Sequence, residues 1–82
     1  MEVSLTVKTF LLSEPIFAGL IPKDVTPDFA LIDSGALDSI GIFSLVSFLE
    51  TTFKITVEPQ DLNESNFQSL RTIENFVRSR AK

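Results

Sequence analysis

The apolar residues of segment 39–53 recur at a helical period, so one face of this segment is apolar and the other is mostly polar. The expected inward face consists of Ile42, Leu45, Val46, Leu49 and Phe53. The outward side carries Ile40, Gly41, Ser44, Ser47 and Thr51, with Phe43 and Phe48 on the flanks and Glu50 as its one acid. This pattern predicts an amphipathic helix of about four turns, with Ser39 in its first turn.

The beginning of the chain shows the same helical spacing at residues 3, 7, 10 and 11. Residues 2–7 also alternate between polar and apolar, which is typical of a strand. The apolar set continues to residue 12, however, and no second segment offers a partner strand, so we favour a helix within residues 1–18. Pro15 would remove a hydrogen bond from the interior of that helix. It therefore either ends the helix or begins a short turn.

Residues 19–38 are rich in turn-forming residues and predict a long loop. Loops of roughly twenty residues are uncommon in small domains and tend to be functional or disordered. This one also contains apolar side chains that can hold it against the core: Ile21, Val25, Phe29, Leu31 and Ile32. We therefore expect an ordered loop.

The last third of the chain predicts one or two short helical turns and then a final helix. Pro59 prevents the preceding helix from continuing, and Leu62 and Phe67 are expected to anchor the short turns in residues 60–67. Ser69 is a suitable cap for a helix from Leu70 to about Ser79. The inward face of this helix is expected to be Leu70, Ile73, Phe76 and Val77. The basic residues Arg71, Arg78, Arg80 and Lys82 are most simply interpreted as solvated.

These elements predict an all-α fold, a small four-helix bundle of three main helices and one short helix with a long loop between the first and second helices. At 82 residues the chain is expected to form one domain, residues 1–82.

Composition excludes several classes of function. The chain contains no Cys, His, Trp or Tyr, so it cannot build a Ser-His-Asp or Cys-His catalytic centre, a disulfide or most transition-metal sites. The spacing of Asp24, Asp28, Asp33 and Asp38 does not follow a calcium-binding loop, and no metal site is expected. A net charge of −4 disfavours nucleic acid and anionic membranes. No apolar run is long enough to span a membrane, and we expect a cytoplasmic protein.

The pair Asp38-Ser39 directly precedes the predicted central helix. Taken alone it indicates only a capped helix start, because either side chain can accept hydrogen bonds from the free N–H groups of the first turn. The residues leave open which of the two is the cap.

The wider sequence resembles the acyl and peptidyl carrier protein family. Asp38-Ser39-Ile40 stands where the family's Asp-Ser-Leu signature opens its second helix, and residues 48–55 match the leucine, acidic stretch, phenylalanine and isoleucine near the end of that helix. Residues 61–62, 66–69 and 73–77 resemble the family's third and fourth helices. The resemblance covers residues 29–78 well and the first helix loosely.

The resemblance implies that Ser39 is esterified to 4'-phosphopantetheine by a separate phosphopantetheinyl transferase, with Asp38 as the flanking recognition or capping residue. The thiol of that group would let a chain without cysteine hold an acyl or aminoacyl thioester. A phosphodiester also suits the positive end of a helix dipole. The chain would then be a carrier and not an enzyme, served by a loading ligase and a downstream transferase or synthase.

The outward side of the central helix is expected to meet these partners through Ile40, Phe43, Ser44, Ser47 and Glu50. Phe43 could equally be a residue at the edge of the core, packed against the loop. Members of the family that serve fatty-acid synthesis are heavily acidic on this side, whereas this chain is not. That difference favours a dedicated carrier for specialised acyl, polyketide or nonribosomal-peptide type biosynthesis, expected to be a monomer. The alternative is an unmodified helical adaptor in which Ser39 is only a helix cap.

Overall fold

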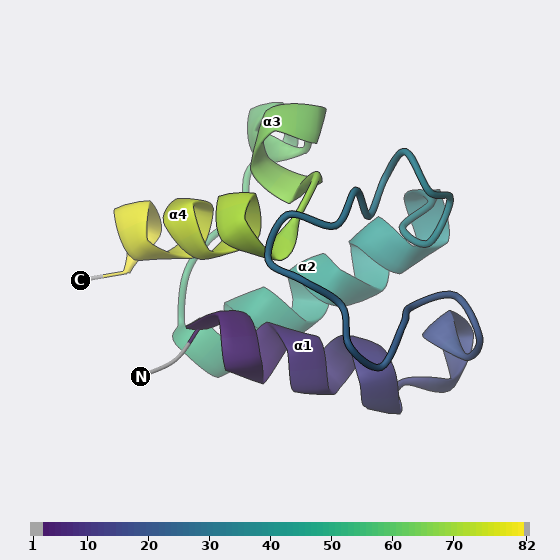
Figure 1. Cartoon of the computed structure of the whole chain (residues 1–82). Coiled ribbons are helices and arrows are strands. Elements are labelled where there is room, and N and C mark those ends of the chain that lie inside the picture. Colours follow the sequence, from purple (N-terminus) through teal and green to yellow (C-terminus); the bar gives the residue numbers. More distant parts are fainter. Residues whose placement is uncertain (1–2, 82) are drawn as a thin grey trace.

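Residues 3–81 are described by a computed structural model, and within them the chain forms four α-helices and two short 3₁₀ helices without any strand (Figure 1). In chain order these are α1 (Val3–Ser13), η1 (Pro15–Phe17), α2 (Ser39–Phe53), η2 (Pro59–Asp61), α3 (Glu64–Phe67) and α4 (Leu70–Arg80). The predicted all-α bundle with a long loop between its first two main helices is confirmed. The predictions for Met1, Glu2 and Lys82 lie outside the described residues.

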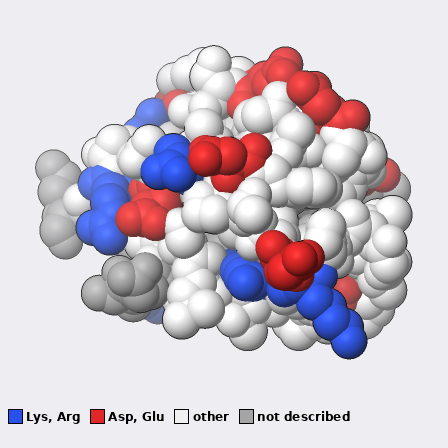
Figure 2. All heavy atoms as spheres, viewed as in Figure 1, with Lys and Arg blue, Asp and Glu red and all other residues white. Residues whose placement is uncertain are grey.

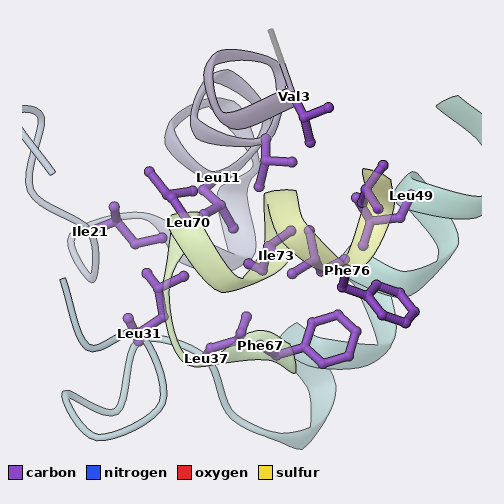
Figure 3. Close-up of a cluster of buried hydrophobic side chains, with 14 of the residues drawn as sticks. Val3, Leu11, Ile21, Leu31, Leu37, Leu49, Phe67, Leu70, Ile73 and Phe76 are labelled. Atoms are coloured by element: carbon purple, nitrogen blue, oxygen red, sulfur yellow. The ribbon is translucent and has the colours of Figure 1, made fainter. Parts of the chain in front are cut away.

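The first helix ends before Pro15, and Pro15 occupies the first position of η1. The helix thus ends before this proline and a short turn begins at it, so both predicted outcomes occur together. The competing prediction of a strand in residues 2–7 is wrong for the described residues. Val3, Val7 and Leu11 are buried along one face of α1. Figure 3 shows Val3 and Leu11 of α1 pointing into the cluster that also contains Leu70, Ile73 and Phe76 of α4.

The long loop is packed against the bundle, as predicted. Its backbone is held at the junction of α3 and α4, where Leu31 N donates to Gln68 O (2.7 Å) and Arg71 N donates to Pro27 O (2.9 Å). The Gln68 side chain also accepts from the backbone N–H of Ile32 at 3.1 Å. The loop therefore returns from η1 to the start of α4 before it reaches the start of α2 (Figure 1). Its buried apolar side chains are Ile21, Val25, Leu31, Ala36 and Leu37.

The predicted bounds of α2 are confirmed, but its predicted inward face is only partly correct. Leu45 and Leu49 are buried, whereas Ile42, Val46 and Phe53 are partly buried at the edge of the core. Gly41, expected on the outward side, is buried instead. A Cβ atom added at Gly41 would lie 2.9 Å from Cε1 of Phe17. The core therefore meets α2 along Gly41, Leu45 and Leu49, because η1 places the Phe17 ring against the first turn of α2.

The final helix is close to the prediction. Ser69 caps α4 by accepting from Thr72 N at 3.2 Å, and the predicted inward residues Leu70, Ile73, Phe76 and Val77 are all buried. Phe67 is buried as expected, but Leu62 is 49% exposed and is not an anchor. The buried residue at that corner is Asp61, which the pattern of apolar residues did not indicate.

Two of the arginines expected to be solvated form ion pairs with carboxylates distant in sequence. Arg71 Nε lies 2.6 Å from Oδ1 of Asp28, and Arg80 Nη2 lies 2.5 Å from Oδ1 of Asp61. On the face shown in Figure 2, most blue basic groups lie next to red acidic ones. Within residues 3–81 no helix combines the length and apolar character needed to cross a membrane, and no group of three or more potential metal ligands is present.

Candidate functional site

The start of α2 is capped by Asp38. Its backbone is extended (φ −95°, ψ −171°), and its Oδ1 atom accepts a hydrogen bond from Gly41 N at 2.8 Å. This is the usual capping arrangement, in which the residue before the helix satisfies a free N–H of the first turn. The question left open by the sequence is thus answered in favour of Asp38. The alternative in which Ser39 is the ordinary cap is wrong.

Ser39 is the first residue of α2 and is exposed, as predicted. Its hydroxyl makes no hydrogen bond to any other group within residues 3–81, so it is free to react with an external group. The chain has no histidine or cysteine to act as a base, and the neighbouring Asp38 carboxylate is already bonded to Gly41 N. The site therefore offers an accessible hydroxyl acceptor but no catalytic machinery of its own.

Ser39 lies at the edge of an apolar cleft of about 300 Å³ between α2 and the connection of residues 54–63, which leads to α3. The residues that line the cleft are Ser39, Ile42, Phe43, Val46, Glu50, Val57, Pro59 and Leu62. This explains the partial burial of Ile42 and Val46, since both side chains face the cleft from the flank of α2. A second hollow of about 280 Å³, which includes Ile16, Leu20 and Ile40, lies near the opposite side of the first turn.

A larger groove than the one beside Ser39 lies elsewhere. It has a volume of about 620 Å³ and runs between α1 and α2 over the stacked rings of Phe10 and Phe48, whose centroids are 4.1 Å apart. Glu14 is its one titratable lining residue. Its hydroxyl groups belong to Thr6, Thr9 and Ser13 of α1, and the Ser13 hydroxyl donates to Phe10 O at 3.2 Å. The groove does not include Ser39, and none of these hydroxyls stands at the start of a helix.

The five residues expected to contact partners are on the outer part of α2, but they differ in availability. Ile40 and Phe43 are 72% and 75% exposed, so Phe43 is not packed against the loop. Ser47 is exposed and Ser44 is half-buried. Glu50 accepts a hydrogen bond from Val57 N at 2.9 Å and is thus already engaged within the chain.

Two residues of this site were not recognised from the sequence. Leu62 borders the same cleft as Ser39 and is half-exposed, although its apolar character suggested a core anchor. Gly41 provides the space that Phe17 occupies beneath the first turn. No local signal distinguishes either position, because both depend on contacts with distant segments.

Comparisons with known proteins match the chain to a family model and to a relative. A family model described as "Phosphopantetheine attachment site" matches residues 17–78, which include Asp38, Ser39 and the whole cleft. Aminoacyl carrier protein 1 of Bradyrhizobium diazoefficiens (strain JCM 10833 / BCRC 13528 / IAM 13628 / NBRC 14792 / USDA 110) is 35% identical over 57 residues, which is 70% of this chain. The match covers 62% of that protein, so the chain spans less than two thirds of the relative's length.

Proposed function

The chain belongs to the phosphopantetheine attachment-site family, and we propose that Ser39 is the residue that carries the 4'-phosphopantetheine group. The observation that carries this proposal is that Asp38, and not Ser39, caps the start of α2. Asp38 accepts the capping hydrogen bond, which leaves the exposed hydroxyl of Ser39 available as the attachment point. Within the matched segment, Ser39 is also the serine that begins a helix beside an apolar cleft.

The residues around Ser39 fit this group. A phosphodiester on Ser39 Oγ would lie at the N-terminus of a 15-residue helix, where free backbone N–H groups and the helix dipole stabilise negative charge. When bound, the group supplies a thiol on which an acyl or aminoacyl group is held as a thioester. Asp38 fixes the first turn and so the direction in which Ser39 is presented.

Attachment requires a separate transferase. Formation of the phosphoester on Ser39 Oγ breaks the diphosphate bond of coenzyme A, whose adenosine bisphosphate part leaves, and it requires removal of the hydroxyl proton. The chain has no histidine to accept that proton, and the carboxylates of Asp38 and Glu50 already accept hydrogen bonds from Gly41 N and Val57 N. We therefore assign the base to the phosphopantetheinyl transferase. We propose that Asp38 and the exposed Ile40 also contribute to recognition by that enzyme.

We further propose that the chain presents its cargo to a loading ligase and a downstream transferase or synthase through the outer part of α2. Ile40 and Phe43 are the principal candidates because both are strongly exposed close to Ser39, with Ser44 and Ser47 beside them. This surface has little charge to attract a basic partner. The Bradyrhizobium relative is an aminoacyl carrier protein, which favours an aminoacyl cargo over a long acyl chain.

The proposal is tested by incubating the protein with coenzyme A and a broad-specificity phosphopantetheinyl transferase and measuring its intact mass. We expect a gain of one phosphopantetheine group. The gain should be absent in Ser39→Ala and retained in Ser47→Ala, which removes a hydroxyl from the same helix. An unchanged mass with several transferases, or a gain that persists in Ser39→Ala, would contradict the proposal.

A further inference from the structure

The outer wall of the cleft beside Ser39 is formed by the connection of residues 54–63. Val57, Pro59 and Leu62 line the cleft from this side. Apart from the single turn of η2, the connection has no regular secondary structure to hold its shape. It leaves α2 through Lys54, which has a left-handed backbone (φ 57°, ψ 43°). Its position against α2 therefore depends on contacts made by individual side chains.

One such contact comes from α2. Glu50 lies about three turns after Ser39 and lines the same cleft. Its Oε2 atom accepts a hydrogen bond from Val57 N at 2.9 Å. A charged acceptor makes a stronger hydrogen bond than a neutral one. Glu50 thus ties the first half of the connection to the helix that bears Ser39.

A second contact comes from the end of α4. The Asp61 carboxylate accepts from Glu58 N at 2.9 Å and from Nη1 and Nη2 of Arg80 at 2.8 and 2.5 Å. The Arg80 guanidinium also lies over the Phe76 ring, 5.0 Å from its centroid. Planar, two-point pairing of this kind fixes orientation as well as distance. It holds η2 against α4.

The two contacts act together with hydrogen bonds inside the segment, such as Leu62 N to Pro59 O and Asn66 Nδ2 to Asp61 O, to hold Leu62 in place. Asp61 is only 5% exposed because it faces Arg80, whereas the next side chain, Leu62, is 49% exposed and borders the cleft. Apolar side chains of this size are exposed close to Ser39 on both sides of the cleft, with Phe43 on α2 and Leu62 on the connection. Both side chains therefore belong to the exposed surface around the cleft that includes Ser39.

We propose that Glu50 and the Asp61–Arg80 pair are positioning residues, which hold the connection against α2 so that Leu62 forms part of the surface met by the transferase that modifies Ser39. This inference rests on the proposed function. In it, Glu50 holds the connection in place through Val57 N and does not contact the partner itself. The transferase must then present an apolar patch to Phe43 and Leu62.

The positioning part is tested by amide hydrogen exchange on the unmodified protein. Arg80→Gln should lower the protection of the Glu58 amide, and Glu50→Ala that of the Val57 amide, each by about tenfold or more relative to the amides of α1. Arg71→Gln is the matched control, because it breaks the Asp28–Arg71 pair, which also makes two hydrogen bonds but lies at the other end of α4. Equal protection of residues 57–62 in Arg80→Gln and Arg71→Gln would overturn the role of Arg80.

The docking part is tested by the kinetics of the same transferase. Leu62→Ser and Arg80→Gln should each raise the KM for the protein by at least about fivefold with kcat little changed, the pattern expected when a binding contact is lost or misplaced. Arg71→Gln should leave KM unchanged. In the double variant Leu62→Ser/Arg80→Gln, the fold increase in KM should be smaller than the product of the two single increases, because both substitutions act through one contact. An unchanged KM in Leu62→Ser would overturn this part.

The two readouts also separate this inference from the proposed function. If the unaltered protein gains no phosphopantetheine, the proposed function and the docking part both fail, while amide exchange still decides the roles of Glu50 and Arg80. If Arg80→Gln does not fold, Glu50→Ala provides the same comparison through Val57. A uniform loss of protection over the whole chain in both variants would show a general structural role and contradict the proposal.

Discussion

Asp38 and Ser39 are adjacent in sequence but have different roles at the start of α2. Asp38 is the last residue before the helix, and its carboxylate bonds to Gly41 N. Ser39 is one residue further on, exposed in the first turn, and its hydroxyl makes no hydrogen bond within residues 3–81. A single residue of difference therefore decides which side chain stabilises the helix and which is available for modification.

Replacing Asp38 should separate these roles. Asp38→Ala removes the capping acceptor and should lower the free energy of unfolding by about 1 kcal/mol. Asp38→Asn keeps a capping oxygen and should leave stability nearly unchanged. Urea unfolding measures both effects. The rate of modification by the transferase then tests the role of the charge. A slower rate for Asp38→Asn would show that the negative charge takes part in recognition, whereas a rate equal to that of the unaltered protein would show that Asp38 only caps the helix.

Packing between η1 and α2 explains the glycine in the first turn of α2. Glycine lowers helix stability by about 1 kcal/mol relative to alanine, so a helix that retains one needs a compensating reason. Here the Phe17 ring, which is 2% exposed, occupies the space next to Gly41. The ring is enclosed and cannot move aside without disturbing its neighbours. The glycine therefore serves contact within the chain, and no partner is needed to account for it.

Gly41→Ala is accordingly expected to be destabilising despite the better helix propensity of alanine. The added Cβ would lie 2.9 Å from Phe17 Cε1, and overpacking of this kind costs about 1–3 kcal/mol. Urea unfolding should show a net loss of about 1 kcal/mol after the propensity gain is included. Ser47→Ala, on the exposed side of the same helix, should be neutral or slightly stabilising. An increase in stability of Gly41→Ala would show that Phe17 moves readily.

Pairing of carboxylates across the bundle makes the whole molecule sensitive to acid. Hydrogen bonds from the Arg71 and Arg80 side chains hold the pKa values of Asp28 and Asp61 below their usual range. The pKa of Glu74 is also lowered, first by the Ser4 hydroxyl and then by Arg78. These contacts join the loop to α4, the connection to α4, and α1 to α4.

A carboxyl group with a lower pKa in the folded state binds protons more readily when the chain unfolds. Its contribution to stability is therefore complete above the ordinary carboxyl pKa and is lost as pH falls through the folded pKa. The urea midpoint should be nearly constant from pH 7 to about pH 5 and should fall steadily below about pH 5. Arg80→Gln should make this decrease shallower, because Asp61 then loses its main cause of a lowered pKa. A midpoint that rises on acidification would contradict the assignment.

The sequence by itself determined the features that depend on neighbouring residues. The all-α fold, both ends of α2, the break at Pro15 and the cap at Ser69 follow from helical periodicity and from residues that start or stop helices. The exposed serine at the start of α2 follows in the same way. These signals act over one or two turns, so they can be recognised without knowledge of the tertiary structure.

Three features were decided by the tertiary structure alone. They are the burial of the face of α2 that contains Gly41, the outward position of Leu62, and the pairing of Asp61 with Arg80. Periodicity shows that a helix has an apolar face but does not show which part of that face the core will cover. That choice depends on Phe17, which lies 24 residues before Gly41 in the chain, and on Arg80, which lies 19 residues after Asp61. The helix start that bears Ser39 is thus a local property of the sequence, whereas the surface that surrounds it is produced by long-range packing.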